Sequence, residues 1–225
     1  MLDNLSFVPA LVACCIVSYL VCGIPFGLIL GELTGKGDIR KSGSGNIGTT
    51  NALRVAGKKV AAATLAFDLL KGTVCLLASR AVLSWASDGL SFVPGSEADW
   101  AVSLVALACL DGHIFSPYLK FHGGKGIATG VGILFGFHWP LALVHLAIFI
   151  VIVAVTKYVS AGSIVTAGVV PVTVFATFPA ITPVSLAIWA LLGWTVVWAH
   201  RGNIARLRAG TESKLSFSSK KDDAS

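Results

Sequence analysis

Three polar stretches of the chain carry the residue types that bind and transform an anionic substrate. The first, Ser42 to Arg54, reads Ser-Gly-Ser-Gly-Asn-Ile-Gly-Thr-Thr-Asn-Ala-Leu-Arg. Glycines let the backbone approach a ligand closely, and successive N–H groups, hydroxyls and a guanidinium are donors that a phosphate accepts from. This stretch therefore predicts an anion-binding loop.

Two further stretches offer matching groups. Asp111 to Gly130 contains His113 and the run Lys120-Phe-His-Gly-Gly-Lys125-Gly, and His200 to Lys214 begins His-Arg-Gly-Asn-Ile-Ala-Arg-Leu. Charge-assisted hydrogen bonds from such cations and amides hold phosphate oxygens. Taken with the apolar segments between them, the three stretches predict a phosphorylated, partly lipidic substrate.

The segments that must position these groups are strongly apolar. Hydrophobic residues make up 55% of the chain and charged residues 12%, whereas soluble domains carry about 25% charged residues. The composition predicts an all-α integral membrane protein with one domain, 1–215, and a polar, disordered tail, 216–225. The net charge of +6 does not indicate nucleic acid, because the basic residues lie in loops and in the tail.

Seven apolar segments are predicted to cross the bilayer. The first would extend roughly 36 Å as a helix, enough for a hydrocarbon layer of about 30 Å. The glycines and the proline from Gly23 to Gly31 predict a kink or close packing in it. The fourth is short enough to be re-entrant instead, and five crossings remain if two runs do not span. The segments are Phe7 to Leu30, Val60 to Trp85, Trp100 to Leu119, Gly126 to Phe137, Leu141 to Thr156, Ala161 to Phe178 and Val184 to Ala199.

The loop charges predict the orientation. The loop from Glu32 to Lys59 has a clear basic excess, and the connection from Ala86 to Asp99 holds acidic residues without Lys or Arg. Basic loops stay in the cytoplasm. We therefore expect an outside N-terminus, a cytoplasmic C-terminus, and all three polar stretches on the cytoplasmic face.

Four motifs, in this order, resemble the bacterial acyl-phosphate:glycerol-3-phosphate acyltransferase family, from about Val17 to Leu215. They are Gly43-Ser-Gly-Asn-Ile-Gly-Thr-Thr-Asn-Ala-Leu-Arg54, Asp68-Leu-Leu-Lys-Gly72, Gly112-His113 with Lys120-Phe-His-Gly-Gly-Lys-Gly-Ile-Ala-Thr129, and His200-Arg-Gly-Asn-Ile-Ala-Arg-Leu207. The longer connection from Ala86 to Asp99 and the polar tail depart from the family pattern without touching a motif.

The resemblance implies a bundle of seven transmembrane helices in the bacterial inner membrane, with the motifs facing the cytoplasm. It implies transfer of a fatty acyl group from acyl phosphate to the 1-hydroxyl of glycerol 3-phosphate, giving lysophosphatidic acid and phosphate. The expected partners are these two substrates and the lipid bilayer, with no cofactor, no metal, no nucleic acid and no obligatory protein partner.

Roles carry over from the family to the matching residues of this chain. The resemblance assigns the donor phosphate to Ser44, Asn46, Gly48, Thr49 and Lys125. It assigns the glycerol 3-phosphate to Arg54, Lys125, Ser163, His200 and Asn203, with Ser44, His200 and Asn203 at the reacting centre. Direct transfer is expected, with the donor phosphate or His200 taking the proton. A covalent acyl-enzyme on Ser44, with His200 as base, is the competing route.

Other interpretations of the same residues have less support. Gly43 to Gly48 satisfies G-x-G-x-x-G, but no apolar strand precedes it, so a dinucleotide fold is not expected. A transporter for a phosphorylated solute is the alternative function; its binding site would lie near the bilayer midplane, whereas these motifs fall on one face.

Several single residues receive a structural interpretation. Asp68 and Lys71 predict an intramembrane ion pair. For His113, a role in the site and a purely structural hydrogen bond stay equally open. Arg206, Arg208 and Lys214 are read as interface anchors. The cysteines lie in apolar runs without the spacing of a zinc site, so buried thiols and no metal-binding cluster are expected: Cys14, Cys15, Cys22, Cys75 and Cys109.

Overall fold

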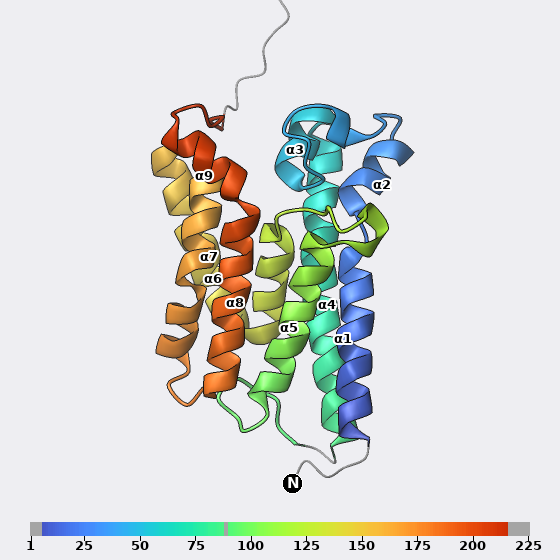
Figure 1. Ribbon diagram of the computed structural model, residues 1–225, viewed down its shortest axis with the longest axis vertical. Coiled ribbons are helices and arrows are strands. Elements are labelled where there is room, and N and C mark those ends of the chain that lie inside the picture. The colour runs from blue at the N-terminus through green and yellow to red at the C-terminus, as the bar shows by residue number, and fades with distance from the viewer. Residues whose placement is uncertain (1–5, 88–89, 216–225) are drawn as a thin grey trace, which may run out of the picture.

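The computed structural model describes residues 6–87 and 90–215, and over these ranges it consists of helices, turns and loops without a strand. The long helices stand side by side in one bundle, while α2, α3 and α9 lie at the end drawn uppermost in Figure 1, here called the upper end. The prediction of an all-α fold is confirmed. The helices are α1 (Phe7–Gly23), α2 (Phe26–Leu33), α3 (Thr49–Val55), α4 (Lys58–Ala86), α5 (Asp99–Ile114), α6 (Ile127–Thr156), α7 (Val159–Thr177), α8 (Pro183–Ala199) and α9 (Arg201–Arg208).

Five helical segments are long and apolar enough to cross a membrane, or six if α8 and α9, which meet at a bend of 56°, count as one. The described part of the chain thus fits a multi-pass membrane protein. The expected disorder of 216–225 lies outside the described residues. The five segments are Phe7–Leu33, Lys58–Ala86, Asp99–Leu119, Ile127–Thr156 and Val159–Thr177.

The expected kink in the first apolar segment is confirmed. The helix stops at Gly23, Ile24 adopts an extended conformation (φ −57°, ψ 120°), and α2 begins after Pro25. A proline disfavours the helical conformation in the residue before it, which explains the break. The break leaves the Ile24 carbonyl free to accept a hydrogen bond from the Lys71 ammonium at 3.0 Å.

The helix α6 is a hairpin of two helical halves that meet at His138, whose backbone is not helical (φ −160°, ψ 102°). The first half runs alongside α4, and Arg80 of α4 donates to the Phe137 carbonyl at 3.1 Å. The second half runs against α7, because His138 packs on Phe178 at the end of α7 while Val153 lies beside Gly162 near its start. Figure 1 shows both ends of α6 nearer the upper end than its middle.

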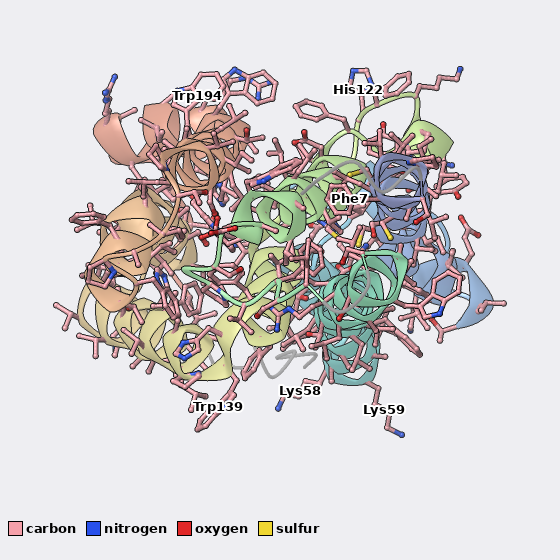
Figure 2. The ribbon with its side chains drawn as sticks, turned by 90° about the horizontal axis from the view of Figure 1, so that it is seen from below. Phe7, Lys58, Lys59, His122, Trp139 and Trp194 are labelled. Atoms are coloured by element: carbon pink, nitrogen blue, oxygen red, sulfur yellow. The ribbon has the colours of Figure 1, made fainter. Side chains whose placement is uncertain are left out.

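Apolar side chains cover the outside of the bundle. On α1 the exposed residues Val8, Val12 and Ile16 recur every four positions and form a stripe along one face. Figure 2, seen from the opposite end, shows Trp139 and Trp194 pointing away from the helices, and both are more than 60% exposed. Such a surface fits acyl chains of lipid as its surroundings.

Glycines set the closest helix contacts inside the bundle. A Cβ added to Gly112 of α5 would lie 2.2 Å from the Tyr19 carbonyl oxygen of α1, and one added to Gly132 of α6 would lie 2.0 Å from the Leu69 carbonyl oxygen of α4. Neither position can carry a side chain unless the helices separate.

The cysteines agree with the sequence prediction in one respect and contradict it in another. All five are free, and four of them are buried, as expected. However, the Sγ atoms of Cys22, Cys75 and Cys109 lie within 4.8 Å of one another. The expectation that no metal-ligating residues cluster is therefore wrong for these three, because sequence spacing within each apolar run says nothing about which helices become neighbours.

Candidate anion-binding site at the upper end

The loop from Ser42 to Gly48 is held in shape by the buried side chain of Asn51 in α3. The Asn51 Oδ1 accepts from the Ser44 N–H at 2.7 Å, and its Nδ2 donates to the carbonyls of Ile39 and Asn46, each at 2.8 Å. Asn46 Oδ1 in turn accepts from the Gly48 N–H at 2.9 Å. The side-chain amide of Asn51 thus satisfies three backbone groups that have no partner in a helix or a sheet.

This loop leaves hydrogen-bond donors available for a ligand. Ser44 is exposed, and the buried Thr49 Oγ1 at the start of α3 has no hydrogen-bond partner. A buried hydroxyl without a partner costs free energy unless a ligand or water satisfies it. Arg54, in the last turn of α3, is exposed at the same end of the molecule.

A second loop docks on the end of α5 and positions Lys125. The N–H of Gly124 donates to the His113 carbonyl at 3.0 Å, and that of Gly123 donates to the Ile114 carbonyl at 2.9 Å. A Cβ on Gly124 would lie 2.1 Å from His113 Nε2, so this close docking requires glycine. Lys125 follows directly and is half-buried.

A chain of hydrogen bonds connects Lys125 to the C-terminal segment. The Lys125 ammonium donates to Asn203 Oδ1, and Asn203 Nδ2 donates to Glu212 Oε1 at 2.6 Å. The same carboxylate accepts from Ser160 Oγ at 2.7 Å and from Arg206 Nε at 2.6 Å. These hydrogen bonds join segments that are distant in sequence. We call the group they form the polar node; it consists of Lys125, Ser160, Asn203, Arg206 and Glu212.

The charges around this node favour an anion. Burial lowers the pKa of Lys125, the nearby cations Arg206 and Arg54 lower it further, and Glu212 opposes them. Burial alone would raise the pKa of Glu212, but hydrogen bonds from Asn203, Ser160 and Arg206 outweigh it and lower that pKa. The carboxylate thus stays ionised, as the one anion among three cations that the structure describes at this place.

His200 lies at the bend between α8 and α9, just beyond the apolar segment. Its Nδ1 is 2.8 Å from the Val196 carbonyl, which can only accept, so this nitrogen carries the proton. Burial lowers the pKa of His200 to about 4, with Lys125 acting in the same direction. The imidazole is therefore neutral at physiological pH, with a lone pair on Nε2.

The structure brings together some of the predicted site residues and not others. Lys125 and Asn203 are in direct contact. The Lys125 charge is close enough to lower the pKa of His200, and the Arg54 charge is close enough to lower that of Lys125. Ser44, Asn46 and Gly48 lie in one loop at the same end, and this loop leads into Thr49 at the start of α3. Ser163 is buried in α7, where its hydroxyl donates to the Val159 carbonyl at 2.9 Å.

The sequence does not single out two of the residues in the polar node, Glu212 and Ser160. Glu212 lies within the polar stretch from His200 to Lys214, and Ser160 lies three residues before the predicted Ser163. Arg206, expected as an interface anchor, pairs with Glu212, and the anchor role stays a prediction. A lone acidic residue within a basic segment was the available signal for Glu212.

The predicted ion pair between Asp68 and Lys71 inside the bundle is confirmed, and it lies beside His113 at the end of α5. Lys71 Nζ lies 2.8 Å from Asp68 Oδ1, and His113 Nδ1 lies 3.8 Å from the same oxygen. His113 thus has an ion-pair environment on one side and the Lys125 loop on the other. Both interpretations of His113 remain compatible with this position.

Comparisons with known proteins agree with one another. The sequence profile of the family described as glycerol-3-phosphate acyltransferase matches residues 12–210. A glycerol-3-phosphate acyltransferase of Brucella anthropi is 41% identical over 206 residues, covering 91% of this chain and 93% of its relative. One of Sinorhizobium medicae is 40% identical over 208 residues, covering 92% and 93%.

Solved structures show the same fold. The crystal structure of PlsY (YgiH), an integral membrane glycerol 3-phosphate acyltransferase, in its glycerol 3-phosphate form aligns with a TM-score of 0.79 at 30% identity, covering 92% of this chain and 96% of the other. Its lysophosphatidic acid form aligns with a TM-score of 0.77 at the same identity. This chain therefore belongs to the glycerol-3-phosphate acyltransferase family.

Proposed function

We propose that this enzyme transfers a fatty acyl group from acyl phosphate to the 1-hydroxyl of glycerol 3-phosphate, releasing lysophosphatidic acid and inorganic phosphate. The observation that carries the proposal is the node at Lys125, where a cation, an amide and a neutral imidazole meet beside further cations. Two anionic substrates need such a concentration of positive charge.

The donor phosphate is assigned to the loop of Ser44, Asn46, Gly48 and Thr49, together with Lys125. The unpartnered Thr49 hydroxyl and the exposed Ser44 supply neutral donors, and Lys125 supplies charge. Asn51 fixes the loop before any ligand arrives. A preformed set of donors lowers the cost of binding.

The acceptor glycerol 3-phosphate is assigned to Arg54, Lys125, Ser163, His200 and Asn203. His200 and Asn203 are one helical turn apart across the bend, and both face the Lys125 region. The Nε2 lone pair of His200 is suited to accept the proton of the attacking hydroxyl. Ser163 would have to break its bond to the Val159 carbonyl or share its hydroxyl to reach this substrate.

The chemistry asks little beyond placement and charge stabilisation. An acyl phosphate is a mixed anhydride, so the carbonyl is already activated and phosphate is a good leaving group. The acceptor oxygen bonds to the carbonyl carbon, the carbon–oxygen bond to phosphate breaks, and the hydroxyl proton goes to His200 or to the departing phosphate. Positioning and preorganised donors supply the acceleration.

Direct transfer is favoured over an acyl-enzyme on Ser44. Within the described residues, no hydrogen bond joins the Ser44 hydroxyl to His200, so the nucleophile lacks an adjacent base. If incubation with the acyl donor alone gave a protein-bound acyl group that hydroxylamine removes, the acyl-enzyme route would be favoured over direct transfer.

The same proposal includes the placement in the membrane. The upper end faces the cytoplasm of the bacterial inner membrane, the N-terminus lies outside, and the two halves of α6 bring the crossings to seven. The hairpin at His138 and the basic residues of the upper end support this arrangement.

The test is phosphate release from palmitoyl phosphate by the purified protein, with and without glycerol 3-phosphate. We expect release that depends on the acceptor, and a loss of about 10²–10³-fold in kcat/KM for Lys125→Met, since a charge-assisted contact to the reacting group is removed. Lys120→Met, an exposed lysine of the same loop, is the matched control and should keep its activity. Release at wild-type rates by Lys125→Met would remove Lys125 from the site.

A further inference from the structure

Three helices each contribute one cysteine to a single point inside the bundle. Cys22 comes from the end of α1, Cys75 from the middle of α4 and Cys109 from α5, and all three are buried. Their Sγ atoms lie within 4.8 Å of one another. Figure 2 shows yellow sulfur atoms gathered where these helices meet.

The packing around the cluster fixes these distances. One turn from Cys22 and Cys75, the hydroxyls of Ser18 and Ser79 lie 3.3 Å apart and tie α1 to α4. On the other side, Lys71 of α4 donates to the Ile24 carbonyl after α1. The close approach of Gly112 to Tyr19 holds α5 against α1. Contacts between the helices that do not involve sulfur thus bring the three thiols together.

The spacing suits one central ion. Thiolates bound to a soft ion at about 2.3 Å lie roughly 3.5–4 Å apart. The three sulfur atoms, within 4.8 Å of one another, would need to move little to reach that separation. Soft ions prefer thiolate over oxygen or nitrogen ligands.

The apolar surroundings of the three thiols favour an ion whose complex with three thiolates is neutral. Three thiolates around zinc(II) or copper(I) would leave one or two negative charges in an apolar interior, where unbalanced charge is costly. Lys71, one helical turn from Cys75 on α4, is already paired with Asp68 at 2.8 Å. A trivalent ion gives a neutral complex and needs no counter-charge.

We propose that Cys22, Cys75 and Cys109 form a three-thiolate site for a soft trivalent ion, with arsenic(III) as the representative. Arsenous acid is neutral and can enter an apolar interior without shedding a charged hydration shell. Three As–O bonds are exchanged for three As–S bonds, the three thiol protons leave as part of three water molecules, and nothing is oxidised or reduced.

The test is the intact mass of the full-length, reduced protein before and after treatment with arsenite, together with a count of the thiols that react once the chain is unfolded, because the three thiols are buried in the folded state. We expect one arsenic per chain and protection of three of the five cysteines. Cys22→Ser, Cys75→Ser and Cys109→Ser should each abolish this protection. A bound ion should also raise the unfolding temperature, because the folded state holds the three thiols together and therefore binds the ion more tightly than the unfolded chain does.

The neighbouring pair Cys14 and Cys15 provides the control. Cys14→Ser removes a candidate dithiol and leaves the cluster intact, so it should bind arsenic like the unmodified protein. Protection of only two thiols, or loss of binding in Cys14→Ser, would overturn the proposal. If a serine variant does not fold, the count on the unmodified protein decides, since no protection there also overturns it.

Discussion

At the scale of the residue, two amide side chains and one carboxylate organise the upper end. Asn51 shapes the loop that precedes α3, Asn203 links Lys125 to the C-terminal segment, and Glu212 accepts from three side chains. Each is mostly buried, so each hydrogen bond it makes has no ready replacement by water.

We expect Asn51→Asp to disorder the loop from Ser42 to Gly48, although the substitution keeps the size of the side chain. An aspartate can still accept from the Ser44 N–H, but it cannot donate to the carbonyls of Ile39 and Asn46 and would place negative charge against them. The cost should be about 1–3 kcal/mol in stability, with a raised KM for the acyl donor. Ser42→Ala, an exposed position of the same loop, serves as control in thermal unfolding and kinetics, and equal behaviour of the two variants would contradict the assignment.

We expect Glu212→Gln to destabilise the protein at neutral pH. The substitution removes the charge that pairs with Arg206 and turns one acceptor into a donor that faces other donors. Thermal unfolding should show the loss, whereas Glu97→Gln, an exposed residue at the opposite end, should leave the unfolding temperature unchanged.

The pH dependence of this difference follows from the lowered pKa of Glu212. The contribution of the carboxylate is fully present above the unfolded-state pKa of about 4.5 and is lost as the pH falls through the lower folded-state pKa. The stability gap between the wild type and Glu212→Gln should therefore close on acidification. A gap that widened toward low pH would contradict the ionised state of Glu212.

At the scale of the element, glycine contacts between helices hold the site loops at their level. The close approach of α4 and α6 at Gly132, and the docking of Gly123 and Gly124 on the end of α5, leave no space for a Cβ. Lys125 lies between these two contacts in sequence, so its position depends on both.

We expect Gly132→Ala to separate α4 from α6 and to cost about 1–3 kcal/mol, because its Cβ would lie 2.0 Å from the Leu69 carbonyl oxygen. Gly130→Ala, on the same helix, meets nothing within 4 Å and should be neutral or stabilising by up to about 1 kcal/mol through helix propensity. Thermal unfolding of the two variants checks the difference. Equal destabilisation would show that the α4–α6 contact is looser than described.

The features that sequence could predict are those encoded within one stretch. The break before Pro25, the Asp68–Lys71 pair and the grouping of Ser44 to Thr49 in one loop depend on neighbours in the chain. Glu212 with Ser160, 52 residues apart, and the three cysteines depend on which helices pack together. The turn at His138 between the two halves of α6 belongs to the first group, because the two apolar runs on either side of His138 and Pro140 predict it.

At the scale of the whole molecule, polarity is segregated by position along the bundle. The upper end holds the glycine-rich loops and the cations, the sides are apolar, and the opposite end holds the acidic connection before α5. This distribution suits an enzyme that takes a charged acceptor from the aqueous side and an acyl chain from the membrane.

The orientation can be tested by labelling with a membrane-impermeant thiol reagent. Trp139→Cys, at the turn of the α6 hairpin and 63% exposed, should react from outside in intact cells stripped of their outer membrane. Arg208→Cys, at the end of α9, should react only in inverted vesicles. Labelling of both from one side would contradict the proposed topology.

The central claim concerns the acyl donor, and a direct comparison of donors tests it best. The purified protein is given glycerol 3-phosphate with palmitoyl phosphate, palmitoyl-CoA or palmitoyl-acyl carrier protein, and lysophosphatidic acid is measured by mass spectrometry. We predict product from palmitoyl phosphate, with one inorganic phosphate released for each ester formed. Product from either thioester but none from palmitoyl phosphate, in a preparation that remains folded, would contradict it.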